Sequence, residues 1–225
     1  MSFSISSNQP SGAPAPVGRI ADVMAGYTRP WCICGGWAVE AWLGGGEMRE
    51  HGDVDVAVFV HDQRALFEHL RGWQLVAHDR NVPGNTSELW DGKRQIDLPG
   101  HIHGRLHPGD DVPVNLDAPG EQGFGLDIQL NDGSADEWIV SREPLISVPM
   151  ARAIAESQWG LPTATPEVLL FYKSRDLRRR DKLDFTRLLP TLSEEQRSWL
   201  RDAIERVGHP WLAKLSGASK DEAVV

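Results

Sequence analysis

The chain has 225 residues, and its 23 lysine and arginine against 32 aspartate and glutamate residues give a formal net charge of −9. This length can bury the core of one large domain or two small ones, whereas the negative charge argues against a large nucleic-acid surface, which needs many cations. No apolar run approaches the ~20 residues that span a bilayer, and residues 1–18 lack the basic start and apolar stretch of a signal peptide. We therefore expect a cytoplasmic protein with no membrane partner and no nucleic-acid partner.

Hydrophobic spacing predicts alternating helices and strands up to residue 140, after a disordered lead at 1–16. The predicted elements are, in chain order, a helix at 17–27, a strand at 31–34, a helix at 37–43, a strand at 53–60, a helix at 63–70, a strand at 73–77, a hairpin at 88–96, and strands at 101–106, 125–130 and 137–140. Residues 107–123 carry three prolines, three glycines and four carboxylates and are interpreted as a surface excursion. The sequence Asn131-Asp132-Gly133 predicts a turn.

From Pro149 onward the pattern has a helical period. The predicted helices are Met150–Gln158, Pro166–Arg178, Asp181–Leu189 and Ser193–Val207. Ser193 and Gln196 form a capping box, and Pro166 suits the first turn of its helix. An α/β segment at 17–148 thus precedes a helical domain at 149–216, with a tail at 217–225.

Two motifs in the α/β segment carry the chemistry that we expect of the chain. Gly35 and Gly36 join the first strand to a helix, and their lack of Cβ atoms lets a ligand approach amides at a helix N-terminus, where the dipole favours an anion. Asp53 and Asp55 are two residues apart and therefore share one face of a strand. We interpret this pairing as a divalent-cation site beside a phosphate site, as a nucleoside triphosphate with its metal requires.

Three basic residues have either a structural or a ligand-binding interpretation. Arg49 and His51 directly precede the carboxylates, where they either contact triphosphate oxygens or remain solvated in a loop. Lys173 follows an apolar stretch. It either needs a counter-charge, which a bound triphosphate would provide, or extends its ammonium group to the solvent.

We expect structural roles for a further set of polar residues. Glu40 is assigned a surface or capping role, and Cys32 and Cys34 are expected to be buried thiols rather than metal ligands. The basic run Arg178–Arg180 with Lys182 is expected to be a solvated helix face with Asp181 and Asp184 as partners. His101 and His103 share a strand face without an evident third ligand.

The glycine corner and the carboxylate pair together resemble the pattern of a known family. Gly35-Gly-Trp-Ala-Val-Glu-Ala-Trp-Leu-Gly44, followed by Arg49-x-His51-x-Asp53-Val-Asp55, is similar to the core motif of the aminoglycoside-2''-adenylyltransferase and lincosamide nucleotidyltransferase group, within the polymerase-β nucleotidyltransferase superfamily. The segments Pro166-Glu-Val-Leu-Leu-Phe-Tyr-Lys173 and Arg180-Asp-Lys-Leu-Asp-Phe185 also resemble the helical C-terminal part of bacterial members. The middle of the chain is much less specific.

The resemblance implies a small mixed sheet flanked by helices, with a C-terminal helical domain closing a cleft. It implies transfer of a nucleoside monophosphate, usually from ATP, to a hydroxyl group with release of pyrophosphate. On this pattern Gly35 and Gly36 hold the triphosphate, while Asp53 and Asp55 bind Mg²⁺. From their positions in the sequence, we assign Arg49 and Lys173 as further triphosphate contacts. The acceptor would be a small hydroxyl-bearing molecule, and the negative net charge favours a cationic one such as an aminoglycoside, which would make the protein an antibiotic-resistance enzyme.

Enzymes of this kind use a third carboxylate, for which two positions compete. Asp127 lies in the alternating strand 126–130, which would hold its side chain rigidly. Asp97 has a spacing from Asp53 and Asp55 that is more usual for the antibiotic-modifying members, but Pro99 and Gly100 follow it directly. We favour Asp127 as the third metal ligand and catalytic carboxylate. Two other functions stay open: an antitoxin that adenylylates a partner protein, and a nucleotide-binding scaffold without catalysis.

Overall fold

The computed structural model describes residues 12–44, 48–49, 51, 53–79, 87–105, 126–142, 144–175 and 178–215. Its strands are β1 (Trp31–Ile33), β2 (Val54–Phe59), β3 (Gln74–Asp79), β4 (Ser87–Leu89), β5 (Gly100–Arg105), β6 (Leu126–Gly133), β7 (Glu137–Ser141), β8 (Ile146–Pro149), β9 (Ile154–Glu156) and β10 (Pro162–Ala164). The α-helices are α1 (Ala15–Val23), α2 (Gly35–Leu43), α3 (Gln63–His69), α4 (Met150–Ala153), α5 (Pro166–Lys173), α6 (Arg179–Leu188), α7 (Glu194–Arg206) and α8 (Leu212–Leu215). Two 3₁₀ helices, η1 (Val60–Asp62) and η2 (Leu189–Thr191), complete them.

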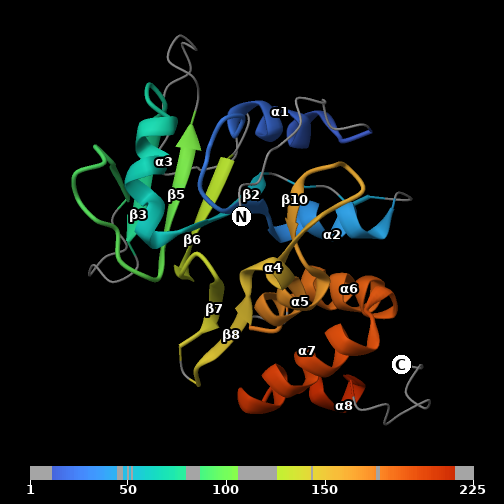
Figure 1. Ribbon diagram of the computed structural model, residues 1–225. Helices are drawn as coiled ribbons and strands as arrows, with labels where there is room; N and C mark the ends of the chain where they lie inside the picture. Colours follow the sequence, from blue (N-terminus) through green and yellow to red (C-terminus); the bar gives the residue numbers. More distant parts are fainter. Residues whose placement is uncertain are drawn as a thin grey trace.

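The described strands form one mixed sheet in the order β4-β3-β5-β6-β2-β1-β10-β9, and β7 and β8 form a hairpin that extends from β6. β2 runs parallel to β6, and β1 runs parallel to β10, whereas the other pairs are antiparallel. Helices α5 to α8 gather on one side of the molecule, in orange and red in Figure 1. The expected α/β class with a mixed sheet and a helical C-terminal region is confirmed.

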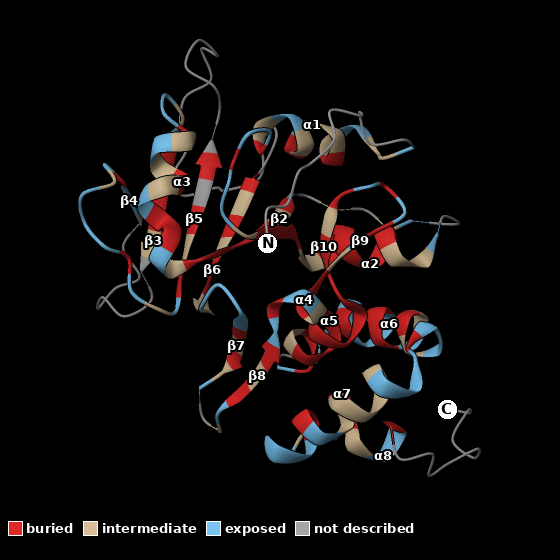
Figure 2. Ribbon diagram, in the orientation of Figure 1, coloured by how far each residue is buried: buried red, intermediate tan, exposed pale blue. Residues whose placement is uncertain are grey.

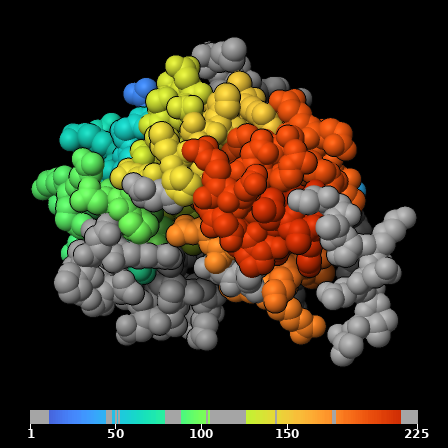
Figure 3. Space-filling view, turned by 90° about the horizontal axis from the view of Figure 1, so that it is seen from below, coloured from blue at the N-terminus to red at the C-terminus, as the bar shows by residue number. Residues whose placement is uncertain are grey.

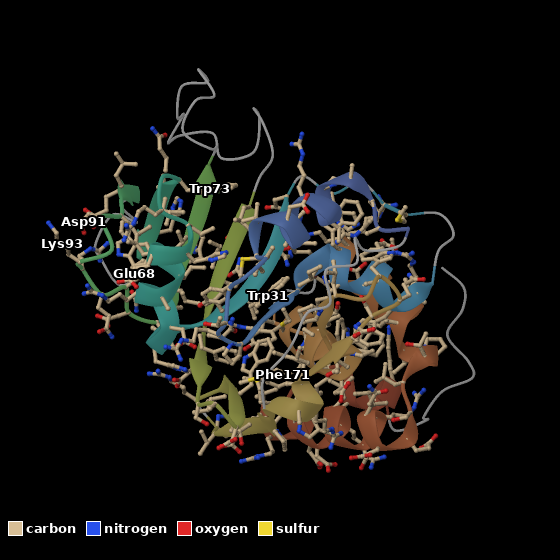
Figure 4. All side chains as sticks on the ribbon, turned by 45° about the horizontal axis from the view of Figure 1, so that its top comes forward. Trp31, Glu68, Trp73, Asp91, Lys93 and Phe171 are labelled. Carbon is tan, nitrogen blue, oxygen red and sulfur yellow. The ribbon has the colours of Figure 1, made fainter. Side chains whose placement is uncertain are left out.

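The core forms where helices cover the central strands. β2 lies between β6 and β1, so that valines on one face and Ala57 and Phe59 on the other are all buried. Helix α1 covers part of the sheet with Val17 and Ile20, and α5 is buried along almost its whole length (Figure 2). In Figure 4 the labelled Trp31 lies within the molecule, while Asp91 lies at its edge.

The structure corrects the predicted hairpin at 88–96. Only β4 is a strand there, and it pairs with β3, while the chain turns at Asp91 and reaches β5 without forming a second strand. The Gln63 side chain replaces the missing partner: its Oε1 accepts from the Ile96 amide at 2.8 Å, and its Nε2 donates to the Ile96 carbonyl at 3.2 Å. Because buried backbone groups need partners, the Gln63 side chain of α3 stabilises this non-strand conformation.

The predicted helix Met150–Gln158 is wrong beyond Ala153. Ile154 is extended, with φ −125° and ψ 125°, and β9 pairs with β10 around a turn in which the Gly160 amide donates to the Ser157 carbonyl at 2.9 Å. Gly160 has φ +70°, which suits this turn because glycine adopts positive φ freely. Tertiary pairing thus overrides the helical spacing, and β9 and β10, after the predicted boundary at 148, belong to the main sheet.

Other predicted boundaries also move. β6 runs through Asn131-Asp132-Gly133, which we predicted as a turn, and the chain reverses at residues 134–136 instead, where the Ser134 hydroxyl accepts from two amides. α5 ends at Lys173 rather than Arg178, and α1 begins at Ala15, inside the predicted lead. The Ser193 capping box and the N1 proline Pro166 are confirmed.

Three predicted segments fall largely outside the described residues: the lead at 1–16, the excursion at 107–123 and the tail at 217–225. Within the described part, no helix has both the length and the apolar character to cross a membrane. Seen from below, the last helices, α6 to α8, form one side of the surface in orange and red, next to the hairpin of β7 and β8 in yellow (Figure 3).

Candidate active site

Two of the predicted acids meet on adjacent strands at the centre of the sheet. Asp55 in β2 lies directly opposite Asp127 in β6 in the parallel register, and both side chains are partly buried. Gln129, two residues farther along β6 and therefore on the same face, connects them: its Nε2 donates to Asp127 Oδ2 at 2.9 Å and lies 3.5 Å from Asp55 Oδ1. The side-chain amide of Gln129 thus stabilises the adjacent carboxylates of Asp55 and Asp127, which would otherwise repel each other.

Asp53, the first carboxylate of the predicted pair, lies one residue before β2 and is exposed. It is close enough for its charge to act on Asp55. The rival position Asp97 is also exposed, in the irregular segment between β4 and β5. The register therefore brings Asp127, rather than Asp97, beside Asp55.

Gly35 and Gly36, the glycine corner, begin helix α2, and other side chains of the protein fill the space that their missing Cβ atoms leave. A Cβ atom on Gly35, which has φ +62°, would occupy the position of the Asp55 carboxylate, and one on Gly36 would meet Arg49 and His51. The Gly36 amide donates to the Asp55 carboxylate. Here the anion at the helix N-terminus is thus Asp55, which benefits from the positive end of the helix dipole.

Opposing influences act on the pKa of Asp55. Burial raises it above its ordinary value, and the negative charge of Asp53 raises it further, whereas the positive charge of Lys173 and the bonds from Gln129 and Gly36 lower it. A proton or a cation beside Asp55 therefore relieves an unfavourable buried charge. Burial also raises the pKa of the neighbouring Cys34 thiol, and the Asp55 charge adds to this effect, so that Cys34 is a neutral thiol.

Lys173 is buried, as its apolar surroundings predicted, but its counter-charge comes from the protein. Its Nζ lies 2.7 Å from Asp184 Oδ2 and 3.8 Å from Asp181 Oδ1, both on α6. Arg49 approaches the same Asp184 with Nε and Nη2, each at 3.4 Å. Both acids have 0% exposure. The counter-charge that we assigned to a bound triphosphate is therefore already present in the protein, and contact of Lys173 with a triphosphate stays a prediction.

Glu40 is a buried ion-pair partner, and the expected surface or capping role is wrong. Two nitrogens of Arg187 donate to its two carboxylate oxygens at 3.0 and 2.8 Å, which joins α2 to α6. His51 Nε2 lies 3.4 Å from Glu40 Oε1, and the His51 ring lies on Trp37 with a centroid distance of 4.4 Å. Burial, followed by the charge of Arg49, lowers the pKa of His51.

Sequence reasoning missed Gln129, Glu40 and Asp184 as members of this network. Strand alternation would have placed Gln129 on the same face as Asp127. For the other two, a signal was present: each is an acid within an apolar or amphipathic helix segment, where a buried charge needs a partner. Elsewhere, His101 stacks on His78, and Arg178 pairs with Asp181 as expected. Asp184, which we expected to pair with the same basic run, is instead buried against Lys173 and Arg49. Cys32 is a buried thiol, and Cys34 is partly buried.

The side chains at the site can be compared with the ligands of Mg²⁺, the metal that the resemblance implies. Among the described residues, no three His, Cys, Asp or Glu side chains are gathered as a complete metal-binding group. Asp55 and Asp127 nevertheless offer hard oxygen donors side by side. Mg²⁺ usually binds through one or two carboxylates and completes its shell with water and substrate phosphates, so this pair fits it.

Comparisons with known proteins add a distant likeness. No protein-family model and no curated protein matches the sequence. The solved structure of a lincosamide antibiotic adenylyltransferase, LnuA, with lincomycin bound, is similar at a TM-score of 0.49 and 17% sequence identity, over 78% of this chain and 96% of that one.

Proposed function

We propose that this protein is a Mg²⁺-dependent nucleotidyltransferase that moves a nucleoside monophosphate, AMP from ATP, to a hydroxyl group of a small acceptor. The observation that carries the proposal is the in-register placement of Asp55 and Asp127 on parallel strands at the N-terminus of α2. The motif from Gly35 to Asp55, which resembles that of the polymerase-β superfamily, supports the same conclusion.

In this proposal Asp53, Asp55 and Asp127 hold the cation. When bound, a divalent ion would lower the pKa of the attacking hydroxyl and neutralise charge on the leaving pyrophosphate. Asp127 would accept the proton of the acceptor hydroxyl, because its strand holds the carboxylate in a fixed position. The Gly36 amide already donates to Asp55, so phosphate oxygens would be bound by the remaining backbone of the corner at Gly35 and Gly36 and by the cationic side chains of Arg49 and Lys173.

The acceptor would bind between segment 17–148 and the helical segment 149–216, and a cationic molecule such as an aminoglycoside suits the net charge of −9. The test is incubation of the pure protein with ATP labelled at the α-phosphate, Mg²⁺ and a panel of aminoglycosides and lincosamides. We expect pyrophosphate release that depends on one acceptor and label in that acceptor. Label on a protein would instead support the antitoxin function, and ATP binding without turnover would support the scaffold.

The third carboxylate is tested with matched variants. Asp127→Asn should abolish transfer, since it removes a cation ligand and the proton acceptor, while Asp97→Asn should retain near-normal turnover because Asp97 is exposed and apart from the pair. The opposite ranking would overturn this assignment.

A further inference from the structure

One buried carboxylate links two distant segments of the chain next to the candidate site. Asp184 of α6 has 0% exposure and contacts Lys173, at the end of α5, and Arg49, in the segment that leads to β2. An isolated charge would be unfavourable at this position, so that the acid depends on its two cations. Neither cation is its sequence neighbour, and their meeting is a product of the fold.

We propose that Asp184 is a positioning residue of the nucleotide site, which holds Lys173 and Arg49 in place to receive the triphosphate. The inference rests on the proposed function and extends it to α6, which contributes none of the proposed metal or phosphate ligands. Asp184 would act through the two cations, without touching the nucleotide itself.

The location of both cations supports this role. Arg49 Nη2 lies where a Cβ atom of Gly36 would project, and the Gly36 amide donates to Asp55. The charge of Lys173 acts on Asp55 and on Cys34, the N-cap residue of α2. Asp184 therefore fixes its two partners at the glycine corner.

Ordering of the two cations before binding also favours an anionic ligand. Long cationic side chains lose about 2 kcal/mol of rotamer entropy when they are ordered, and Asp184 orders these two before a ligand arrives, which lowers the cost of binding.

A purely structural role is the alternative, because the contacts also join α6 to the segment before β2. Glu167 provides a matched control for this role. It is likewise an acid with 0% exposure in the helical part, paired with Arg152 at 3.5 Å and bonded by Gln196 at 2.8 Å. It lies in the first turn of α5, whereas Lys173 ends that helix.

The experiment measures binding of two probes, ATP and inorganic tripolyphosphate, each with Mg²⁺, by calorimetry on the full chain. Asp184→Asn should weaken both affinities about tenfold, a typical coupling between members of one network, while Glu167→Gln should keep the wild-type affinities despite a comparable loss of thermal stability. Lys173→Met combined with Asp184→Asn should weaken binding by less than the product of the single effects, because Asp184 acts partly through Lys173.

The outcomes separate this inference from the proposed function. Wild-type affinity in Asp184→Asn, equal weakening in Glu167→Gln, or fully multiplicative effects in the double variant would overturn the positioning role alone. If the wild-type protein bound neither probe, both proposals would fail. If it bound them with the expected ranking of variants but never transferred a nucleotide, only the transferase function would fail.

Discussion

Replacing Gly35 by alanine tests whether the glycine corner is required by crowding as well as by backbone conformation. Gly35 and Gly44, at the two ends of α2, both have positive φ, +62° and +75°. A Cβ atom on Gly35 would collide with Asp55, whereas one on Gly44 has only Gln158 Oε1 near it, at 3.8 Å. Gly44→Ala therefore measures the conformational strain alone.

The expected magnitudes follow from these contacts. An L residue in the left-handed region costs about 1 to 2 kcal/mol, and crowding of a packed site adds about 1 to 3 kcal/mol. We expect a loss of about 1 kcal/mol for Gly44→Ala and about 3 kcal/mol for Gly35→Ala. At about 2 to 4 °C per kcal/mol for a chain of this length, the melting temperatures should fall by about 3 °C and about 9 °C.

The assay is thermal unfolding followed by circular dichroism, with urea unfolding at 25 °C as a second measure. Gly35→Ala should also lose any stabilisation by Mg²⁺, because the added methyl group displaces Asp55, while Gly44→Ala should retain it. Equal losses of stability in the two variants would refute the crowding argument, since the contact with Asp55 is the main difference between the two sites.

Three further predictions concern the rest of the molecule. Arg187→Met should destabilise the protein by about 3 kcal/mol, and by more than Glu40→Met. Loss of Arg187 leaves Glu40, with 2% side-chain exposure, without this cation, whereas Arg187 is 23% exposed and can be hydrated when Glu40 is lost. Urea unfolding that ranks the two variants in reverse would contradict this. Burial lowers the pKa of His209 from 6.5, so that near this pH the unfolded chain binds a proton more readily than the folded chain. The free energy of unfolding should therefore fall as the pH drops below that value. His209→Gln should flatten this part of the plot of stability against pH, and an unchanged slope would exclude His209 as its source. Ser193→Ala removes the acceptor for the Gln196 amide and should cost about 1 kcal/mol, measured against Ser198→Ala in the middle of α7.

The strands around the site could be predicted because their signals are local. Alternation in β6 and the apolar run of β2 identified both strands, and the choice of Asp127 over Asp97 followed from the same alternation. The pairing of Asp55 with Asp127 agrees with that choice. Whether these residues bind a metal stays a prediction.

The buried ion pairs could not be predicted, because their partners lie far apart in the chain. Glu40 and Arg187 are separated by 147 residues and Arg49 and Asp184 by 135, and periodicity reports which face is buried rather than what it meets. The strands β9 and β10 were missed for a similar reason. Three-residue strands leave too little alternation to read, and their identity comes from pairing with each other and with β1.

The same brevity affects how the sheet ends. Among the described strands, the main path of the sheet ends at β4 and β9, each of three residues, and the branch through β7 ends at β8, of four residues. An open edge strand is a template on which another chain can add a strand, and short edges are one means by which natural proteins prevent fibril-like association. Although the sheet is wide, each of these end strands is short, which should limit strand addition by another copy of the chain at high concentration.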